Sequence, residues 1–374
     1  MQNIMTVAGT RPELIRLSQI IPRLDAVCEH SFIYTGQNYD KNLKDIFFDS
    51  LNIREPEIQA DNGICSSCTG ISDKLHLLMS FVETAIEEIE PDKILILGDT
   101  DSSLAATMIA EKKGIPVYHM EAGNRCWDKE VPEEVNRRMI DSIASFNMPY
   151  TEKSAQNLYR EGHHPSKVFV CGNPIFEVIT KNINRIDECK IRRDLGIYDK
   201  FIVATFHRQE NVDNQEKLER IVYALETIGE LTKIKIIVST HPRTRDKLLK
   251  LAKSYAVSTL DEMNYSDNLV FIEPVNFFQF CSLEKNAEVV ITDSGTVQEE
   301  ACIFGTPTVT IRNSTERPET VETGSNIVTI VKSLNILEAF EIAMKMENGW
   351  KKPAQYSVPN VSQAVVNYIL GNQL

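Results

Sequence analysis

The sequence predicts an α/β protein with two Rossmann-like, doubly wound domains, and three observations lead to that prediction. Short apolar runs alternate with amphipathic stretches along most of the chain, as in parallel sheets covered by helices. This alternation restarts after the segment Gly172-Asn173-Pro174. The length of 374 residues also exceeds one ordinary hydrophobic core and suits two domains. We therefore expect a first domain over residues 1–170 and a second domain over residues 171–355.

In the first domain, strand-like runs and helical stretches follow one another in strict order. Leu14, Leu17, Ile20 and Leu24 recur at helical spacing, and Gly114 is a typical residue just beyond a helix end. The predicted strands span residues 4–8, 30–35, 93–97 and 115–119, and the predicted helices span residues 13–27, 71–89, 102–113 and 133–145.

The second domain repeats the same order of elements. Its predicted strands span residues 201–205, 234–239, 289–292 and 308–311, and its predicted helices span residues 214–228 and 296–304, while the last helix of the chain is predicted over residues 362–370. Because strands that alternate with helices form parallel sheets, ligand-binding residues are expected at the carboxyl ends of the strands.

Composition excludes several classes of protein. The net charge of −13 argues against a nucleic-acid partner, which would call for a basic stripe. No apolar run approaches the roughly 18 residues of a membrane span. The chain begins with a strand-like run at residues 3–8 instead of a signal peptide. These features predict a cytoplasmic protein with no membrane partner.

The glycine and cysteine patterns argue against a bound cofactor. No G-x-G pair occurs, so the dinucleotide fingerprint and the P-loop are both absent. Cys65 and Cys68 form the one C-x-x-C pair, and a structural zinc site needs about four ligands. We interpret this pair as two thiols in a loop, and we expect neither a cofactor nor a metal.

Carboxylates and arginines gather after two strands of the first domain. Glu121, Arg125, Glu133 and Arg137 lie in the segment after residues 115–119, and Asp99 follows the strand at 93–97. Carboxylates that approach one carbon from different sides suit the removal and return of a proton. The alternative for Asp99 is an N-cap of the next helix, a role that Asp101 fits better.

Two strand-to-helix turns have the small residues of a phosphate-binding turn. The first covers residues 8–13 with Arg11, and the second contains Ser294, Gly295 and Thr296. The alternative for each is a tight turn closed by an N-cap.

Histidine and arginine also follow strands of the second domain. His207 precedes Arg208, and His241 lies two residues before Arg243, which suits a site for an anionic leaving group. Arg317 is expected in a loop that reaches the cleft between the domains.

Eight motifs, in order along nearly the whole chain, resemble the non-hydrolysing UDP-N-acetylglucosamine 2-epimerase family. They are GTRPE (9–13), TGQ (35–37), GDT (98–100), HMEAGNR (119–125), PEEVNR (132–137), FHRQEN (206–211), TDSGTVQEEA (292–301) and ERPE (316–319). The resemblance implies the GT-B fold of two Rossmann-like domains with an interdomain cleft, a final helix (residues 356–374) that returns to the first domain, and a homodimer. Asn124, Cys126 and Thr296 depart from the commonest members. The sequences HMEAGNRC (119–126) and VPEE (131–134) resemble the branch that acts on modified sugars for capsules and O-antigens.

By this resemblance, Asp99, Glu121 and Glu133 fall on the family's catalytic carboxylates and His207 on its essential histidine. Arg11, Ser294 and Glu300 match positions that contact the nucleotide, with Glu300 suited to the ribose hydroxyls. Phe280 matches an aromatic residue beside the uracil. The implied substrate is a UDP-sugar, with UDP leaving during the reaction.

The implied reaction inverts C2 of a UDP-N-acetylhexosamine through loss of UDP to a 2-acetamidoglycal and its re-addition. Which carboxylate is acid and which is base stays open. Alternatives are a hydrolysing epimerase that releases free sugar, a UDP-sugar glycosyltransferase of the same fold, and a non-catalytic nucleotide-sugar sensor.

Overall fold

The computed structural model describes residues 1–36, 48, 50–60, 68, 70–129, 131–251, 253, 255–259, 268–347 and 349–371. Cys65 and Gln37, which belong to the C-x-x-C pair and the TGQ motif, lie outside these ranges. The chain divides into two compact units. The first contains residues 1–180 and 354–374, and the second contains residues 181–353.

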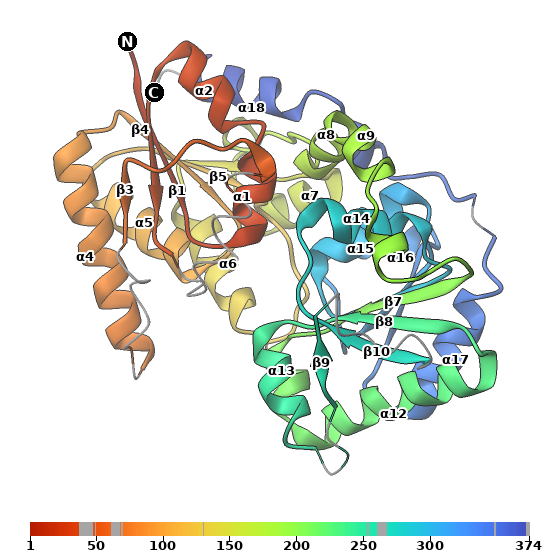
Figure 1. The fold of residues 1–374 in the computed structure, drawn as a ribbon. Coiled ribbons are helices and arrows are strands. Elements are labelled where there is room, and N and C mark those ends of the chain that lie inside the picture. Colours follow the sequence, from red (N-terminus) through yellow and green to blue (C-terminus); the bar gives the residue numbers. More distant parts are fainter. Residues whose placement is uncertain are drawn as a thin grey trace. The chain divides into compact units, whose positions relative to one another are not determined.

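The first unit contains a parallel six-stranded sheet in the order β3-β2-β1-β4-β5-β6 (Figure 1). This is the strand order of doubly wound dinucleotide-binding folds. Its strands are β1 (Asn3–Ala8), β2 (Glu29–Tyr34), β3 (Ile58–Gln59), β4 (Lys93–Leu97), β5 (Val117–Met120) and β6 (Phe146–Met148). Its helices are α1 (Arg11–Leu17), α2 (Ile21–Val27), α4 (Ile71–Ile89), α5 (Asp101–Lys112), α6 (Pro132–Ile143), α7 (Glu152–Arg160), α8 (Pro174–Lys181, ending at the unit boundary) and α18 (Val361–Gly371), with short 3₁₀ turns at Pro165–Lys167 and Ala354–Ser357.

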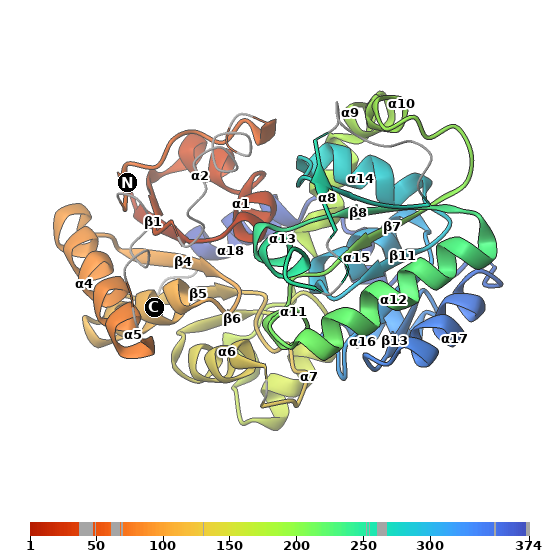
Figure 2. The same cartoon turned by 60° about the horizontal axis from the view of Figure 1, so that its bottom comes forward.

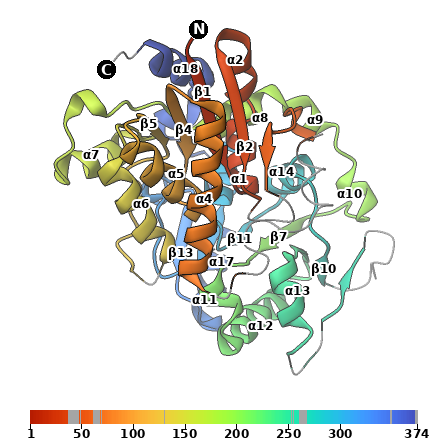
Figure 3. The same ribbon diagram turned by 90° about the vertical axis from the view of Figure 1, so that its left-hand side faces the viewer.

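One core of this unit lies between its sheet and α4 and α5 (Figure 3). Met5 and Ile96 from the strands pack with Val82 from α4 and Leu104 from α5, and all four are buried. The final helix α18 lies beside α2, where Arg23 donates hydrogen bonds to Ser362 (2.6 Å) and Gln363 (2.7 Å) (Figure 1).

The second unit contains a parallel seven-stranded sheet in the order β13-β12-β11-β7-β8-β10-β9. Its strands are β7 (Phe201–Thr205), β8 (Lys235–Ser239), β9 (Val257–Ser258), β10 (Leu269–Ile272), β11 (Val290–Thr292), β12 (Thr308–Ile311) and β13 (Asn326–Thr329). Its helices are α9 (Ile183–Asp187), α10 (Ile191–Asp194), α11 (Gln209–Val212), α12 (Gln215–Thr232), α13 (Pro242–Leu248), α14 (Phe277–Asn286), α15 (Gly295–Phe304), α16 (Pro318–Glu322) and α17 (Ser333–Ala343).

Helices cover both faces of this second sheet. On one face, α12 and α17 lie side by side and pack Leu225 and Phe340 against Ile202 and Ile291 (Figure 2). On the other face, α14 and α15 contribute Leu283 and Val297 to two smaller clusters. Two parallel-sheet α/β units confirm the predicted fold class.

The prediction of one helix over residues 13–27 is wrong, because the chain turns between α1 and α2. Pro22 has no N–H to donate to the carbonyl of Ser18, so a continuous helix would lose that bond. The hydroxyl of Ser18 instead donates to the carbonyl of Ile15 (2.7 Å) and closes the end of α1. None of the helices in the described ranges is both long and apolar enough to span a membrane.

Candidate active site

Glu13 lies where the strand order of the first sheet reverses, between the carboxyl ends of β1 and β4. Open α/β sheets bind their ligands at such a point. One carboxyl oxygen of Glu13 accepts the N–H groups of Gly9 (2.7 Å) and Thr10 (2.6 Å), and the other accepts the hydroxyl of Thr100 (2.9 Å). Glu13 therefore ties the turn after β1 to the turn after β4.

This arrangement corrects the prediction for the first turn. The N–H groups of Gly9 and Thr10 are not open to a phosphate, because Glu13 already occupies both. Burial raises the pKa of Glu13 to about 7, even though the hydrogen bonds from Gly9, Thr10 and Thr100 lower it. Arg11 is half-buried at the first position of α1, and its role in nucleotide binding stays a prediction.

Asp99 follows β4 and is held by an arginine from α6. Arg137 donates two hydrogen bonds to one oxygen of Asp99, at 3.0 and 2.6 Å, and a third to Glu134 at 2.9 Å. The guanidinium of Arg137 is almost fully buried, so it fixes the direction of the Asp99 carboxylate. The structure thus brings together two of the predicted site residues.

Neither Asp99 nor Asp101 caps the helix that follows, although the sequence had favoured Asp101 for that role. The hydroxyl of Thr100 accepts the N–H of Ser103 (3.2 Å) and is the N-cap of α5. Asp101 lies one residue later and binds Lys74 (2.7 Å).

Glu121 begins the loop after β5 in a left-handed backbone conformation, with φ of 69°. Such a conformation is costly for a residue with a side chain, and it recurs at functional sites. The Glu121 N–H donates to the carbonyl of Met148 (3.1 Å), which fixes the loop to β6. The side chain of Asn124 donates to the Glu121 carboxylate at 3.4 Å, and Arg16 lies 3.8 Å from it.

A buried network of charged groups lies beneath this loop. Asp141 from α6 faces His119 (2.9 Å) and accepts hydrogen bonds from Arg125 (2.7 Å) and the N–H of Gly123 (3.0 Å). Burial alone would raise the pKa of Asp141, but His119 and Arg125 together hold it below its ordinary value. The Nε2 of His119 also lies 2.9 Å from the carbonyl of Gly98, so this network connects the loops after β4 and β5.

Arg125, a predicted substrate-binding residue, belongs to this network. Its guanidinium is fully buried between Asp141 and Glu161 and also donates to the carbonyl of Asn124 (2.7 Å). The geometry therefore gives Arg125 the role of holding the loop, and a contact with substrate stays a prediction.

Glu133 and Glu134 lie in the first turn of α6 but have different surroundings. Glu134 is buried and accepts the N–H groups of Cys126 (3.0 Å) and Trp127 (3.3 Å). Glu133 is only partly buried, which leaves it accessible for acid–base chemistry. Because Glu134 and Asp99 share Arg137, hydrogen bonds link Asp99 to the turn that carries Glu133.

In the second unit, Asp293 lies where the strand order reverses between β7 and β11. Its carboxylate accepts the N–H groups of His207 (3.0 Å) and Arg208 (3.0 Å) and the amide of Asn211 (2.9 Å). Burial raises the pKa of Asp293 despite these hydrogen bonds. Asp293 thus shapes the loop that carries His207 and Arg208, as Glu13 shapes its own turn in the first unit.

The side chain of His207 is more exposed than that of Arg208, its neighbour in this loop. Its ring is 38% exposed and stacks on the ring of His241, with the centroids 5.3 Å apart. His241 itself accepts the N–H of Arg243 (3.2 Å) as the N-cap of α13. The structure therefore brings the two predicted histidines into contact.

The turn before α15 is lined by side chains from the loop after β12. A Cβ at Gly295 would lie 2.4 Å from a carboxylate oxygen of Glu316, so a larger residue there would require the Glu316 side chain to move. The hydroxyls of Ser294 and Thr296 lie 3.2 Å apart. Glu316 is an anion beside a helix N-terminus, which is where a phosphate is predicted to bind.

Arg208 and Arg317 both approach this turn. Arg208 donates to Glu316 at 3.5 Å, and Arg312 binds the other oxygen of Glu316 at 2.8 Å. Arg317 is buried and forms an ion pair with Glu299. In this structure both predicted anion-binding arginines are neighbours of protein carboxylates.

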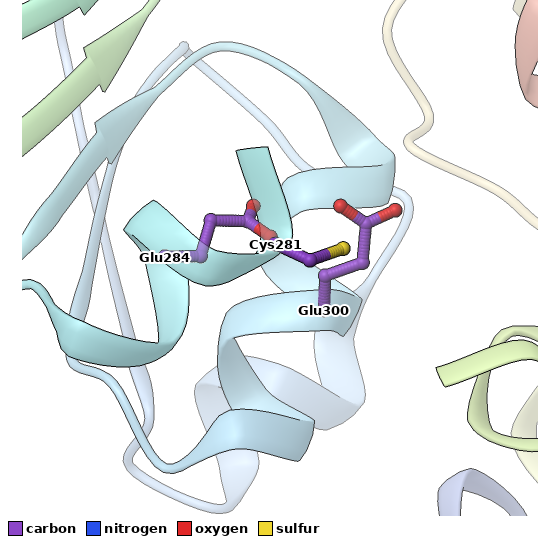
Figure 4. A group of neighbouring side chains, drawn as sticks. All are labelled: Cys281, Glu284 and Glu300. Atoms are coloured by element: carbon purple, nitrogen blue, oxygen red, sulfur yellow. The ribbon is translucent and has the colours of Figure 1, made fainter. Parts of the chain in front are cut away.

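Phe280 and Glu300, the predicted uracil and ribose contacts, lie on neighbouring helices. Phe280 is partly buried on α14, against the clusters that line α15. Glu300 on α15 is buried beside Cys281 and Glu284 of α14 (Figure 4). The Cys281 sulfur and one carboxyl oxygen of each glutamate lie within 4.8 Å of one another. Burial raises the pKa of the Cys281 thiol well above its ordinary range.

The predicted site residues thus lie at the carboxyl ends of strands or in the helices that follow. Several buried carboxylates that hold these loops were not predicted to have a role: Glu13, Glu134, Asp141, Asp293 and Glu316. The one signal for them in the sequence is their position within or near the motifs.

The chain is similar to known proteins over most of its length. The family model described as UDP-N-acetylglucosamine 2-epimerase matches residues 23–370. A UDP-N-acetylglucosamine 2-epimerase of Methanocaldococcus jannaschii is 38% identical over 352 residues, which cover 93% of each chain. A UDP-2,3-diacetamido-2,3-dideoxy-D-glucuronate 2-epimerase of Pseudomonas aeruginosa is 32% identical over 331 residues, which cover 87% of each chain.

Solved structures give the same result. The crystal structure of M. jannaschii UDP-GlcNAc 2-epimerase in complex with UDP-GlcNAc and UDP superimposes with a TM-score of 0.90 at 35% identity, over 99% of this chain and 100% of that chain. The Neisseria meningitidis UDP-GlcNAc 2-epimerase bound to UDP-GlcNAc has a TM-score of 0.88 at 26% identity, over 99% and 100% of the two chains. With a matching family model over most of its length and relatives above 30% identity, this chain belongs to the UDP-N-acetylglucosamine 2-epimerase family, a family of isomerases.

Proposed function

We propose that this protein inverts C2 of a UDP-N-acetylhexosamine by eliminating UDP to a 2-acetamidoglycal and adding it back. The observation that carries the proposal is the placement of Asp99, Glu121 and Glu133 after β4, after β5 and in the first turn of α6. These are the acid–base groups that epimerisation without a redox cofactor requires.

The chemistry follows from the weak acidity of the C2 proton. C2 has no neighbouring carbonyl in the ring, so its proton becomes removable as the anomeric C1–O bond breaks and positive charge develops at C1. A carboxylate takes the proton, the C–H electrons form the C1=C2 bond, and UDP leaves with the electrons of the C1–O bond. A proton then returns to the opposite face of C2 while a phosphate oxygen of UDP attacks C1.

Residues of the first unit are assigned to proton transfer. Asp99, Glu121 and Glu133 share the base, acid and charge-stabilising functions. The buried Arg137 orients Asp99, and the Asp141 network fixes the loop that begins at Glu121. Orientation of this kind lowers the entropic cost of reaching the transition state.

Residues of the second unit are assigned to UDP. His207 and Arg208 suit the negative charge that grows on the departing diphosphate, and the turn at Ser294–Thr296 suits its phosphates. Phe280 and Glu300 are assigned to the uracil and the ribose. Arg11, Arg125, His241 and Arg317 are further candidates for contacts with substrate.

The sugar is proposed to be UDP-GlcNAc or a modified UDP-N-acetylhexosamine, in the supply of precursors for bacterial surface polysaccharides such as capsules and O-antigens. The similarity to the P. aeruginosa diacetamido-glucuronate epimerase supports including modified sugars among the proposed substrates. The resemblance to the branch for UDP-N-acetyl-L-fucosamine supports the same wider range of substrates. We also propose a cytoplasmic homodimer that needs no metal or other cofactor.

Exchange of the C2 proton tests the mechanism directly. Purified protein would be incubated in D₂O with UDP-GlcNAc and a panel of UDP-N-acetylhexosamines, and C2 configuration and isotope content would be read by NMR. We expect deuterium at C2 of the epimer and no net loss of UDP-sugar. An epimer without deuterium would contradict proton transfer at C2, and stoichiometric UDP with free sugar would identify a hydrolysing enzyme.

Substitution of the carboxylates tests their roles. Glu121→Gln and Asp99→Asn keep the shape of each side chain but cannot accept the proton, so each should lower turnover by about 10²–10⁴-fold. Slowed variants should also release detectable 2-acetamidoglycal. Turnover near that of the wild type in both variants would contradict the assignment.

A further inference from the structure

Glu284 is a buried carboxyl group that the proposed reaction does not use. It lies on α14 with no exposed surface, and neither of its oxygens receives a hydrogen bond from an N–H or O–H group of the described residues. Figure 4 shows its side chain between α14 and α15, beside Cys281 and Glu300. An isolated buried carboxylate is costly, so such a group favours its neutral form.

The surroundings of Glu284 favour a retained proton. Burial and, next, the negative charge of the neighbouring Glu300 raise its pKa well above the ordinary range. The thiol of Cys281 opposes this shift as a weak donor to the same carboxyl. Two neighbouring buried carboxyl groups hold one proton between them more readily than two negative charges.

A neutral carboxylic acid has one O–H to donate, and Glu300 is the acceptor in reach. One carboxyl oxygen of Glu284, one of Glu300 and the Cys281 sulfur lie within 4.8 Å of one another. A hydrogen bond received by one oxygen of Glu300 restricts its terminal torsion and leaves the other oxygen to accept further donors. The direction of that second oxygen is then set by Glu284.

We propose that Glu284 is a positioning residue that donates a hydrogen bond to Glu300 and so aims the Glu300 carboxylate at the ribose hydroxyls of UDP. This inference rests on the proposed function for the assignment of Glu300 to the ribose. It goes beyond that function by making Glu284 a determinant of the preference for a ribonucleotide over a 2′-deoxyribonucleotide.

Matched substitutions at Glu284 separate hydrogen bonding from shape. Glu284→Gln keeps an N–H donor toward Glu300, whereas Glu284→Met fills a similar volume without one. The full-length protein would be titrated calorimetrically with UDP and with 2′-deoxy-UDP. We expect the Gln variant to keep the wild-type preference for UDP within about threefold and the Met variant to lose about tenfold of it, because an orienting hydrogen bond is absent. Cys281→Ala, which leaves both carboxyls intact, should keep the preference.

A spectroscopic measurement tests the proton itself and does not need the Met variant to fold. The infrared difference between wild type and Glu284→Gln at neutral pH should contain the carbonyl-stretch band of a protonated carboxylic acid. Absence of that band would overturn the proposal, as would a Met variant with wild-type preference or a Gln variant that loses as much as Met. A stoichiometric metal ion in the purified protein that Cys281→Ala removes would also overturn it, because the carboxyls would then be ligands.

The outcome for this inference is distinguishable from the outcome for the proposed function. If UDP-sugars are epimerised but the three variants share one ribose preference, the inference fails and the function stands. If UDP binds with the expected preferences but C2 never exchanges, the function fails and the role of Glu284 stands. If UDP does not bind at all, both fail.

Discussion

Individual buried carboxylates hold the loops of the candidate site in both units. Glu13 accepts the N–H groups of its own turn and, across the point where strand order reverses, the hydroxyl of Thr100. Asp293 accepts backbone N–H groups across the corresponding point of the second sheet. Asp141 does the same for Gly123 and also faces His119 and Arg125. Each carboxylate satisfies polar groups that would otherwise be buried without partners, so its removal should be felt in stability as well as in activity.

Asp141→Asn should lower stability by about 3 kcal/mol at neutral pH, because it removes the buried carboxylate that Arg125 and His119 both face. The folded-state pKa of Asp141 lies below its ordinary 3.8. Its stabilisation is therefore present above about pH 4 and is lost as the pH falls through the folded-state pKa. Denaturant unfolding at pH 7 and at successively lower pH would measure both effects. Asp246→Asn, an exposed change, is the control, and equal stability of the two variants at pH 7 would contradict the prediction.

Glu13 has the opposite linkage, because burial raises its pKa from 4.5 to about 7. The folded protein binds a proton that the unfolded chain releases, so stability should fall as the pH rises from about 4.5 to 7, by on the order of 3 kcal/mol. Glu13→Gln should remove this dependence, because an amide does not titrate in this pH range. The amide can still meet the same N–H and hydroxyl groups, so the fold should be kept. Unfolding free energies over this pH range would show it, with exposed Glu88→Gln as the control. A Glu13→Gln profile as steep as that of the wild type would exclude the linkage.

At the scale of elements, the loop between β5 and α6 depends on close packing against α7. Gly123 has φ of 75°, and a Cβ there would lie 2.2 Å from the carbonyl oxygen of Ser154. Because backbone cannot move as a flexible side chain can, a substitution displaces the loop that carries Glu121. Positive φ alone would cost about 1 kcal/mol.

Gly123→Ala should therefore reduce epimerase turnover at least tenfold and destabilise the first unit by more than about 2 kcal/mol, since a steric clash adds to the backbone strain. Gly162→Ala is the matched control: its φ is 95°, but a Cβ there meets nothing within 4 Å. It should cost about 1 kcal/mol and leave turnover unchanged. Steady-state kinetics and thermal unfolding of the two variants would compare them. Similar losses of turnover in both would show that strain, and not contact with Ser154, limits the loop.

The elements were predictable where a short-range pattern decides them. β4 and β7 are continuous apolar runs, as strands buried on both faces are, and both occupy the predicted residues. α4 also spans its predicted range. The break between α1 and α2 was missed although Pro22 signals it, and two-residue strands such as β3 have too little pattern to detect.

The motifs predicted which loops carry chemistry, but not how buried groups support them. Asp99 and Glu121 were identified from their position after strands. The pairing of Asp99 with Arg137 joins residues 38 positions apart. The N-cap of α5 is Thr100 and not the predicted Asp101. Contacts of this kind depend on how helices pack on the sheet, which a single sequence does not encode in any local pattern.

At the scale of the whole molecule, the last helix completes the unit that the first residues begin. Val361, Val365, Val366 and Ile369 of α18 are almost fully buried. The N–H and hydroxyl of Ser362 donate to Glu177 at 2.8 and 2.7 Å. The second unit, residues 181–353, has core clusters made only of its own residues. The two ends of the chain thus share one folding unit, and the middle of the chain forms the other.

Deletion of residues 361–374 should unfold the first unit and spare the second. Burial of each aliphatic side chain contributes about 1.5–3 kcal/mol, so the loss of four exceeds the roughly 5 kcal/mol that marks the lower end of domain stability. Glu177 would also lose both donors from Ser362. Hydrogen exchange should therefore show lost protection in β1, β4 and β5 and retained protection in β7, β8 and β11. Asn367→Ala, an exposed change on α18, should leave both sets protected. Retained protection of β1 and β4 in the truncated protein would mean that the first unit folds without its C-terminal helix.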